Sequence, residues 1–522
     1  MRAAGWAVAA LLLGYGLLSI HGPAVLGGFD LVPGDAGDTR IMAFLLESGW
    51  RAMGGEGDFR SPPMFFPTAG TRAFTDAHLL WLPLYGGLRV LGLDMLQSLS
   101  ALLVLLLAGG YLAALWLFRA ALGLGPASAG IGAFLFVFGN ALTQKLNHGQ
   151  LAGVAVLPVI LLLLHAAWRH DRTWLAVVAG ALTGLLAATS FVVAWFFLFI
   201  AGLAWGVGLL RERAVRRYWR LPVAFVGGLV LGLGPFFWIY GAQILHGPRW
   251  GLGMAYHYRP VLSDLLNLGP EHPVWGGVLL WFGVPALRED SLGERMMGFS
   301  PPVWVLAGLG FWLLRGRRRA ELRALAWAAV AAVAVILLQF DYGLHAYAWR
   351  VAAMLPGGGA IRTSFRSMLV ILLPVAALVA IALQGMRRTW LLLACAVLLD
   401  SGLVHPPYGV GARAERLAMA EAPALPQGCA AFALAPGPEA GRVAWMLESD
   451  ALMLVLHWRV PTLNGNSSWA PDGWALLDPS EPGYARALAA WVRANGLTGV
   501  CLYDPLEQRF LPAAETWALL TL

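Results

Sequence analysis

Long unbroken apolar stretches, separated by shorter polar segments, dominate the pattern of the chain. A membrane-spanning helix needs about 20 mostly apolar residues, and sometimes as few as about 17. By this criterion we predict eleven spans, which start near Gly5, Leu96, Ala127, Leu151, Thr173, Phe191, Leu221, Pro301, Leu322, Phe365 and Thr389. The first run lacks a convincing cleavage site, so we interpret it as an uncleaved span. The pattern predicts a mainly α, polytopic transmembrane helical bundle.

Composition narrows the class of protein further. The chain has 522 residues, of which 59% are apolar and only 12% are charged. About a quarter of the residues of a soluble domain are charged. The few charges here could not coat several soluble domains, which excludes a soluble multidomain enzyme, a disordered protein and a coiled coil. Transmembrane β-barrels alternate polar and apolar residues, whereas these apolar runs are continuous.

The basic residues indicate the orientation of the spans. The formal net charge is +7, which in a membrane protein reports topology rather than nucleic acid, so we expect no nucleic-acid partner. Arginine clusters fall on the side of Arg2, at Arg119, Arg169, Arg172, 211–220, 315–323, Arg387 and Arg388. Because basic residues concentrate in cytoplasmic loops, we predict a multi-pass protein of the bacterial inner membrane. Its N-terminus would lie inside and its C-terminus outside.

Two domains follow from this topology. Residues 1–404 form the transmembrane domain, with long extracytoplasmic loops at 27–94, 243–300 and 339–364. In the first loop, 39–53 and 77–93 are expected to lie as helices at the membrane surface. From residue 405 to residue 522 the composition is normally polar. Strand-like runs start at Cys429 and Gly499, and a helix-like run starts at Tyr484. This pattern predicts a small α/β domain outside the membrane.

Two of the three cysteines, Cys429 and Cys501, belong to the outer domain and lie in its two strand-like runs. An oxidising compartment would permit a bond between them. The sequence does not supply the Cα separation that a disulfide requires, so both the paired and the unpaired states stay open. Cys395 lies in the last predicted span and is expected to be a small buried apolar residue.

The first outer loop carries the most informative polar residues. Asp35 and Asp38 follow the first span and lie beside Arg40. Carboxylates at the membrane edge can bind a divalent metal, Mg²⁺ or Mn²⁺, or act as a general base, and arginine can hold a phosphate. Alternatively these are solvated loop acids, with Asp38 capping the next helix. Asp76 and His78, further along the loop, are candidate substrate-binding residues, although a lone histidine is more often structural.

Two later outer segments carry candidate phosphate-binding residues. The tight turn QKLNHGQ holds Lys145, His148 and Gln150, which is unusually polar for a link between two spans. The segment LPGGGAIRTSFRSM places Arg362 and Arg366 at the mouth of the tenth span, against the usual charge bias. Either segment could instead be an ordinary solvated turn or an interfacial loop. The chain has no Walker motif, dinucleotide fingerprint, zinc-type spacing or Ser-His-Asp signature.

Several loop segments carry a family resemblance. GDTRIMAFLLESGWRAMGG, SPPMFFPTAGTRAFTDAHLL, NHGQLAGVAVLPVILLLLHAA, LPGGGAIRTSFRSMLVILLPV and PTLNGNSSWAPDGW resemble bacterial multi-span GT-C-type glycosyltransferase-like proteins, including the YfhO-like group. The resemblance implies sugar transfer from a polyprenyl-phosphate donor to a lipid, glycan or protein acceptor outside the cytoplasm. It also implies a catalytic acid in the first outer loop, for which Asp38 is the best match and Asp35 the second. Related transferases often have Asp-Glu before the arginine, whereas this chain has Gly37-Asp38-Thr39-Arg40.

Two other classes of function stay open. A transporter or flippase of lipid-linked glycans should show inverted repeats or broken spans around a midplane site, and neither is evident in the sequence. A non-enzymatic membrane protein with a partner-binding outer domain would tolerate the loss of the loop acids. We therefore expect a GT-C-like bundle whose partners are membrane lipids, a polyprenyl-phosphate sugar and an extracytoplasmic acceptor.

Overall fold

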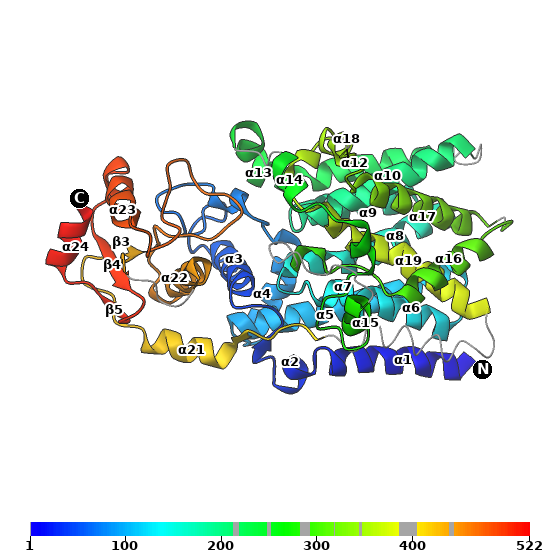
Figure 1. The fold of residues 1–522 in the computed structure, drawn as a ribbon, viewed down its shortest axis with the longest axis horizontal. Helices are drawn as coiled ribbons and strands as arrows, with labels where there is room; N and C mark the ends of the chain where they lie inside the picture. The colour runs from blue at the N-terminus through cyan, green and yellow to red at the C-terminus, as the bar shows by residue number, and fades with distance from the viewer. Residues whose placement is uncertain are drawn as a thin grey trace. The chain divides into compact units, whose positions relative to one another are not determined.

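The computed structural model describes residues 2–211, 219–247, 252–281, 293–317, 319–343, 347–385, 405–437 and 443–521. The chain is mainly helical and divides into two compact units (Figure 1). The helical unit comprises Met1–Gly27, Leu103–Trp238 and Pro248–Pro407. The mixed unit comprises Gly28–Leu102, Ile239–Gly247 and Tyr408–Leu522. The first outer loop and the C-terminal segment thus belong to one compact unit, although more than 300 residues separate them in the chain.

Apolar helices build the helical unit. Its main helices are α1 (Arg2–Ser19), α6 (Pro126–Phe138), α8 (Leu157–His170), α9 (Thr173–Ala187), α10 (Phe191–Arg211), α12 (Arg220–Gly232), α16 (Pro301–Leu313), α17 (Ala320–Leu338) and α19 (Ser367–Gly385). Shorter helices are α2 (Gly22–Leu26), α7 (Asn140–Thr143), α14 (Leu252–His257), α15 (Trp275–Trp281) and α18 (Trp349–Ala353). Two helices, α5 (Met95–Leu122) and α13 (Gly234–His246), have residues in both units.

The lengths of these helices confirm a multi-pass membrane protein but not the count of eleven spans. Within the described residues, six helical stretches are long and apolar enough to cross a membrane. The pair α12 and α13, bent by 63°, would make a seventh. Pro235 cannot continue a helix from the preceding turn, which accounts for the break. Three further predicted spans are shorter helices, Ala3–Ser19, Thr173–Ala187 and Pro301–Leu313, and the span predicted near Thr389 lies outside the described residues.

Glycines set the closest helix contact of this unit, between α9 and α12. A Cβ atom on Gly180 would lie 1.9 Å from the carbonyl oxygen of Phe225, and one on Gly228 would lie 1.9 Å from that of Val177. Gly184 and Gly232 approach each other in the same way one turn later. Small residues four apart let two membrane helices pack backbone against backbone. No larger side chain fits at these contacts.

The mixed unit has a three-stranded sheet with helices packed on it. Strand β3 (Ala431–Leu434) pairs in parallel with β4 (Val500–Asp504), and β4 pairs antiparallel with β5 (Arg509–Phe510). Helix α23 (Tyr484–Ala494) buries Leu488 and Trp491 in the same apolar core as β3 and β4, and α24 (Ala513–Leu520) packs on α23. The runs predicted as two strands and a helix therefore form β3, β4 and α23, because their apolar faces share one core.

Helix α3 (Asp38–Met53), predicted as an amphipathic surface helix, packs against other helices of the mixed unit. It contacts α22 (Ala444–Trp458) and α4 (Leu82–Val90), and buries residues such as Phe44 and Leu46. An amphipathic pattern shows only that one face is apolar, and here neighbouring helices cover that face. The short strand β1 (Leu31–Val32) pairs with β2 (Val410–Gly411), just before α21 (Ala412–Glu421). The first loop is thus tied to the C-terminal segment by backbone bonds.

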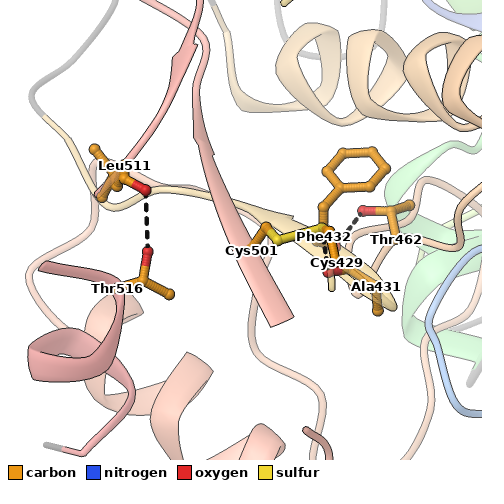
Figure 2. The surroundings of a disulfide bond; sticks show 7 residues. All are labelled: Cys429, Ala431, Phe432, Thr462, Cys501, Leu511 and Thr516. Atoms are coloured by element: carbon orange, nitrogen blue, oxygen red, sulfur yellow. Dashed lines mark hydrogen bonds between the residues drawn. A yellow bond between two sulfur atoms is a disulfide. The ribbon is translucent and has the colours of Figure 1, made fainter. Parts of the chain in front are cut away.

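A disulfide joins Cys429 and Cys501 (Figure 2), with Cα atoms 5.7 Å apart, which lies in the usual range for such bonds. The bond closes a separation of 72 residues beside the β3–β4 pair. Thr462 donates to the carbonyl oxygen of Phe432 at 3.1 Å, and Thr516 donates to that of Leu511. The two cysteines that the sequence left open are therefore paired in the structure.

The motif PTLNGNSSWAPDGW has a structural explanation in the mixed unit. The buried carboxylate of Glu448 on α22 accepts a hydrogen bond from the Asn464 side chain at 2.9 Å and one from the Gly465 backbone at 2.7 Å. Asn464 also donates to the Tyr484 hydroxyl at 3.2 Å. Burial raises the pKa of Glu448 well above its ordinary value, despite these two donors. The motif thus holds α22 and α23 together.

Candidate functional site

The polar turn QKLNHGQ, between the apolar stretches Pro126–Thr143 and Gly149–His170, belongs to the helical unit. Helix α7 ends at Thr143, and the 3-10 helix η3 (Gly149–Val156) begins after His148. The side chains of Asn140 and Gln144 both donate to the carbonyl oxygen of Leu268, at 3.1 and 2.6 Å. These bonds connect the turn to the segment that precedes α16. Hydrogen bonds to another part of the helical unit therefore fix this turn in place.

Glu294 brings together three of the predicted phosphate-binding residues. Arg366 donates to its carboxylate through Nε, at 3.0 Å, and through Nη2. Nε2 of His148 lies 3.4 Å from the same carboxylate. Lys145, which is buried, donates to the carbonyl oxygen of the adjacent Gly293. Lys145, His148, Arg366 and Glu294, here called the cationic cluster, come from three separate parts of the sequence.

The electrostatics of the cationic cluster favour anions. Burial alone would raise the pKa of Glu294, but the charge of Arg366, the His148 hydrogen bond and the charge of Lys145 hold it well below its ordinary value. Glu294 is therefore ionised near neutral pH. Two permanent cations still face this one carboxylate, and His148 adds a third when protonated. An excess of guanidinium and ammonium groups can neutralise a phosphate.

A buried ion pair positions the segment that carries Glu294. Arg295 donates from Nε to Oδ2 of Asp264 at 2.7 Å and from Nη2 to Oδ1 at 3.0 Å. Asp264 also accepts the backbone N–H of Val261 at 2.7 Å. Burial raises the pKa of Asp264, an effect that Arg295 partly offsets. Glu294, Arg295 and Asp264 were not among the predicted site residues; the adjacent Glu-Arg pair in an outer loop was the available signal.

Gln150 and Arg362 are the other two residues predicted in these segments. Gln150 is the second residue of η3. The guanidinium of Arg362 lies over the ring of Tyr258, 5.8 Å from its centroid. Of the two arginines predicted at the mouth of the tenth span, Arg366 therefore joins the cluster directly.

The acids of the first outer loop begin α3 in the mixed unit. Oδ1 of Asp35 accepts the backbone N–H groups of Gly37 and Asp38, both at 2.8 Å. Asp38 is the first residue of α3. Gly37, and not Asp38, therefore occupies the N-cap position, and Asp35 accepts the two N–H groups that begin the helix. Arg40 is bound by Glu415 and by Asp450, the latter at 2.9 Å, so a phosphate would compete with two carboxylates for it.

Asp76 and His78 lie in an enclosed part of the mixed unit. Burial, with a smaller effect of Arg72, lowers the pKa of His78 to about 3. The imidazole is therefore neutral at physiological pH and could not offset a phosphate charge. Arg72 is fully buried and donates to the carbonyl oxygen of Leu45 at 3.1 Å and to the hydroxyl of Ser48 at 3.1 Å. This buried arginine is a structural residue that holds the loop against α3.

The possible ligands of the predicted divalent metal site are the carboxylates of Asp35 and Asp38. Among the described residues, no group of three His, Cys, Asp or Glu side chains is close enough to hold a metal ion. Oδ1 of Asp35, one of the two carboxylates proposed as ligands, already accepts two backbone N–H groups. A divalent metal held by Asp35 and Asp38 stays a prediction.

The bundle of apolar helices defines a multi-pass membrane protein, and comparison with solved structures supports the expected GT-C-like fold. The arabinofuranosyltransferase AftD from Mycobacteria matches with a TM-score of 0.55 and 17% identity, over 96% of this chain and 35% of that chain. A mutant of the same enzyme matches with a TM-score of 0.52 and 16% identity, over 100% of this chain and 38% of that chain. This chain thus spans little more than a third of AftD.

A third structure is less similar. The Archaeoglobus fulgidus oligosaccharyltransferase, tethered with an acceptor peptide, has a TM-score of 0.45 and 13% identity, over 89% of this chain and 64% of that chain. No protein-family model matches the chain, and no curated protein matches it in sequence. The likeness to AftD therefore concerns the fold.

Proposed function

We propose that the protein is an integral membrane glycosyltransferase of GT-C type. It would transfer a sugar from a polyprenyl-phosphate donor to a lipid, glycan or protein acceptor outside the cytoplasm. The fold shared with an arabinofuranosyltransferase supports the reaction class. The resemblance of the loop motifs to YfhO-like proteins is a finer prediction within the same proposal.

The observation that carries the proposal is the cationic cluster. Sugar transfer from a lipid-phosphate donor leaves a phosphate, whose developing charge must be stabilised in place. Lys145 and Arg366 supply permanent positive charge around Glu294, and His148 lies beside the same carboxylate. Because Glu294 orients Arg366 and His148, and the Gly293 carbonyl oxygen orients Lys145, little reorganisation is needed when the phosphate leaves.

Asp38 is the proposed general base. The acceptor hydroxyl must lose a proton as the new glycosidic bond forms, and a carboxylate can take it. Asp38 opens α3, where the helix amide end favours a negative charge. Asp35 accepts two backbone N–H groups at this end, and the carboxylate of Asp38 is the one proposed for the proton transfer.

Sugar transfer from a polyprenyl-phosphate donor, measured in membranes, tests the proposal. Asp38→Asn should lower the transfer rate by roughly two or more orders of magnitude at unchanged expression. The matched control is Asp472→Asn, an exposed acid of the same unit, which should transfer like the wild type. Full activity of Asp38→Asn would reject the base, and no transfer by the wild type with any polyprenyl-phosphate sugar would reject the reaction class.

One observation fits the rival class of lipid-linked glycan transporters. Helices α12 and α13 form a pair bent by 63° at a one-residue break, and broken helices can line transport sites. A flippase would move a fluorescent lipid-linked sugar across proteoliposomes without changing it chemically. Under the favoured proposal the labelled sugar is transferred to an acceptor, and Asp38→Asn stops the transfer.

A further inference from the structure

A cavity of about 290 Å³ lies in the mixed unit, apart from the cationic cluster. Its basic lining comes from α3, α4 and α21 and from the end of α22, through Arg51, Arg89, Arg416 and Arg459. Glu47 and Asp94 are its acidic lining residues. Met95 and Leu96, the first residues of the apolar helix α5, form part of its apolar wall. Four guanidinium groups thus share one cavity with two carboxylates.

Glu47 orients two of these arginines. Its carboxylate, only 2% exposed, accepts from Arg51 Nε at 3.1 Å and from Arg89 Nε at 2.9 Å. The Tyr85 hydroxyl donates to it at 2.8 Å. Burial would raise the pKa of Glu47, but the bonds and charges of Arg89, Tyr85 and Arg51 lower it below its ordinary value. Glu47 is therefore a fixed anion that holds two cations and leaves one positive charge over.

Of the other two arginines, only Arg459 adds positive charge to the lining. Arg416 pairs with Asp94, so that pair contributes no net charge. Arg459 reaches Glu56, which is not a lining residue, at 3.7 Å, and 69% of its side chain is exposed. The lining thus carries four guanidinium groups against two carboxylates. Such a balance attracts an anion and disfavours a cation.

The donors left over suit a phosphate. A guanidinium has five N–H donors. Within the described residues, Arg51 uses Nε toward Glu47 and Nη1 toward the carbonyl oxygen of Leu456 at 3.1 Å, which leaves Nη2 for a ligand. Arginine binds phosphate oxygens in pairs through its planar fork. The apolar wall of Met95 and Leu96 would contact a carbon chain attached to the phosphate.

We propose that this cavity is a binding site for a phosphate ester, with Arg51, Arg89, Arg416 and Arg459 as its cationic walls and Glu47 as the residue that positions the first two. The phosphate could belong to a lipid head group, since the wall includes the start of an apolar helix, or to a soluble ester. Both sources share the same recognition chemistry. The inference does not depend on sugar transfer, because binding is its readout.

Isothermal titration of the full chain in neutral maltoside micelles with sn-glycerol 3-phosphate tests the site. The wild type should bind, and glycerol should not. The double variant Arg51→Gln/Arg459→Gln removes two cations at similar side-chain length and should weaken binding by roughly tenfold or more. Added salt should weaken wild-type binding as well, because part of the attraction is screened.

Arg509→Gln is the matched control. Arg509 is a half-exposed arginine of the same unit that pairs with Glu507 and does not line the cavity, so its variant should bind like the wild type. No binding by the wild type, or equal binding by the wild type and the double variant, would overturn the proposal. The same titration, repeated in phosphatidylglycerol nanodiscs, separates the two sources of phosphate. If sn-glycerol 3-phosphate no longer binds there, the lipid phosphate occupies the site. If it still binds, the site takes a soluble ester.

Discussion

At the scale of single residues, substitutions of Asp35 test its structural role at the start of α3. Its side chain accepts two backbone N–H groups at the start of α3. Asn keeps an oxygen in this place, whereas Ala does not. We expect Asp35→Ala to lower the free energy of unfolding by about 1 kcal/mol and Asp35→Asn to cost much less. Thermal unfolding followed by tryptophan fluorescence measures both. Equal melting of the two variants would contradict a capping role.

The stability that Glu294 contributes should depend on pH. Because the folded state holds its pKa below the ordinary value of 4.5, its contribution to stability is present above that value and is lost as pH falls through the folded pKa. Melting of Glu294→Gln compared with wild type between pH 5 and 3 checks this. The difference in melting temperature should shrink as the pH falls through this range; a difference that grows in acid would contradict it.

At the scale of elements, the Asp264–Arg295 pair holds the segment that carries Glu294. Removing one partner of a buried pair leaves an uncompensated charge, which costs about 3–5 kcal/mol. We expect Arg295→Met to lower the melting temperature strongly. The double variant Asp264→Leu/Arg295→Met should recover much of the loss. The exposed Arg317→Gln serves as the control and should melt like the wild type.

Failure of the double variant to recover would show that specific hydrogen bonds, rather than charge balance, hold this segment. The carboxylate of Asp264 also accepts the backbone N–H of Val261, so a small residual loss is expected from that unsatisfied donor. Activity offers a second readout. If Arg295 acts by positioning Glu294, Arg295→Met should lower sugar transfer even at temperatures where the variant stays folded.

At the scale of the whole molecule, the arginine clusters predict that the C-terminus lies outside the cytoplasm. A reporter enzyme that works only outside the cytoplasm, fused after Leu522, should be active. The same reporter fused after Arg317, in a predicted cytoplasmic loop, should be silent. The reverse pattern would invert the predicted topology.

The sequence alone determined the membrane class, because the thickness of the bilayer dictates the length of an apolar run. It also located β3, β4 and α23 of the mixed unit, since alternating and helical periodicities are local properties. The number of spans could be predicted less well from the sequence. Helix α9 has only 15 residues, fewer than the about 17 that a short span needs, and the bent pair α12 and α13 can be counted as one span only if the break is allowed.

Only the tertiary structure decided which polar residues meet. Lys145, His148, Glu294 and Arg366 are separated by up to 221 residues in the chain, yet His148 and Arg366 contact the carboxylate of Glu294, and Lys145 donates to the carbonyl oxygen of the adjacent Gly293. The same holds for the disulfide of Cys429 with Cys501 and for the arginines around Glu47. Periodicity reports which face of an element is apolar, but carries no information about the distance between elements. The sequence therefore named Lys145, His148 and Arg366 separately, and folding brought all three to Gly293 and Glu294.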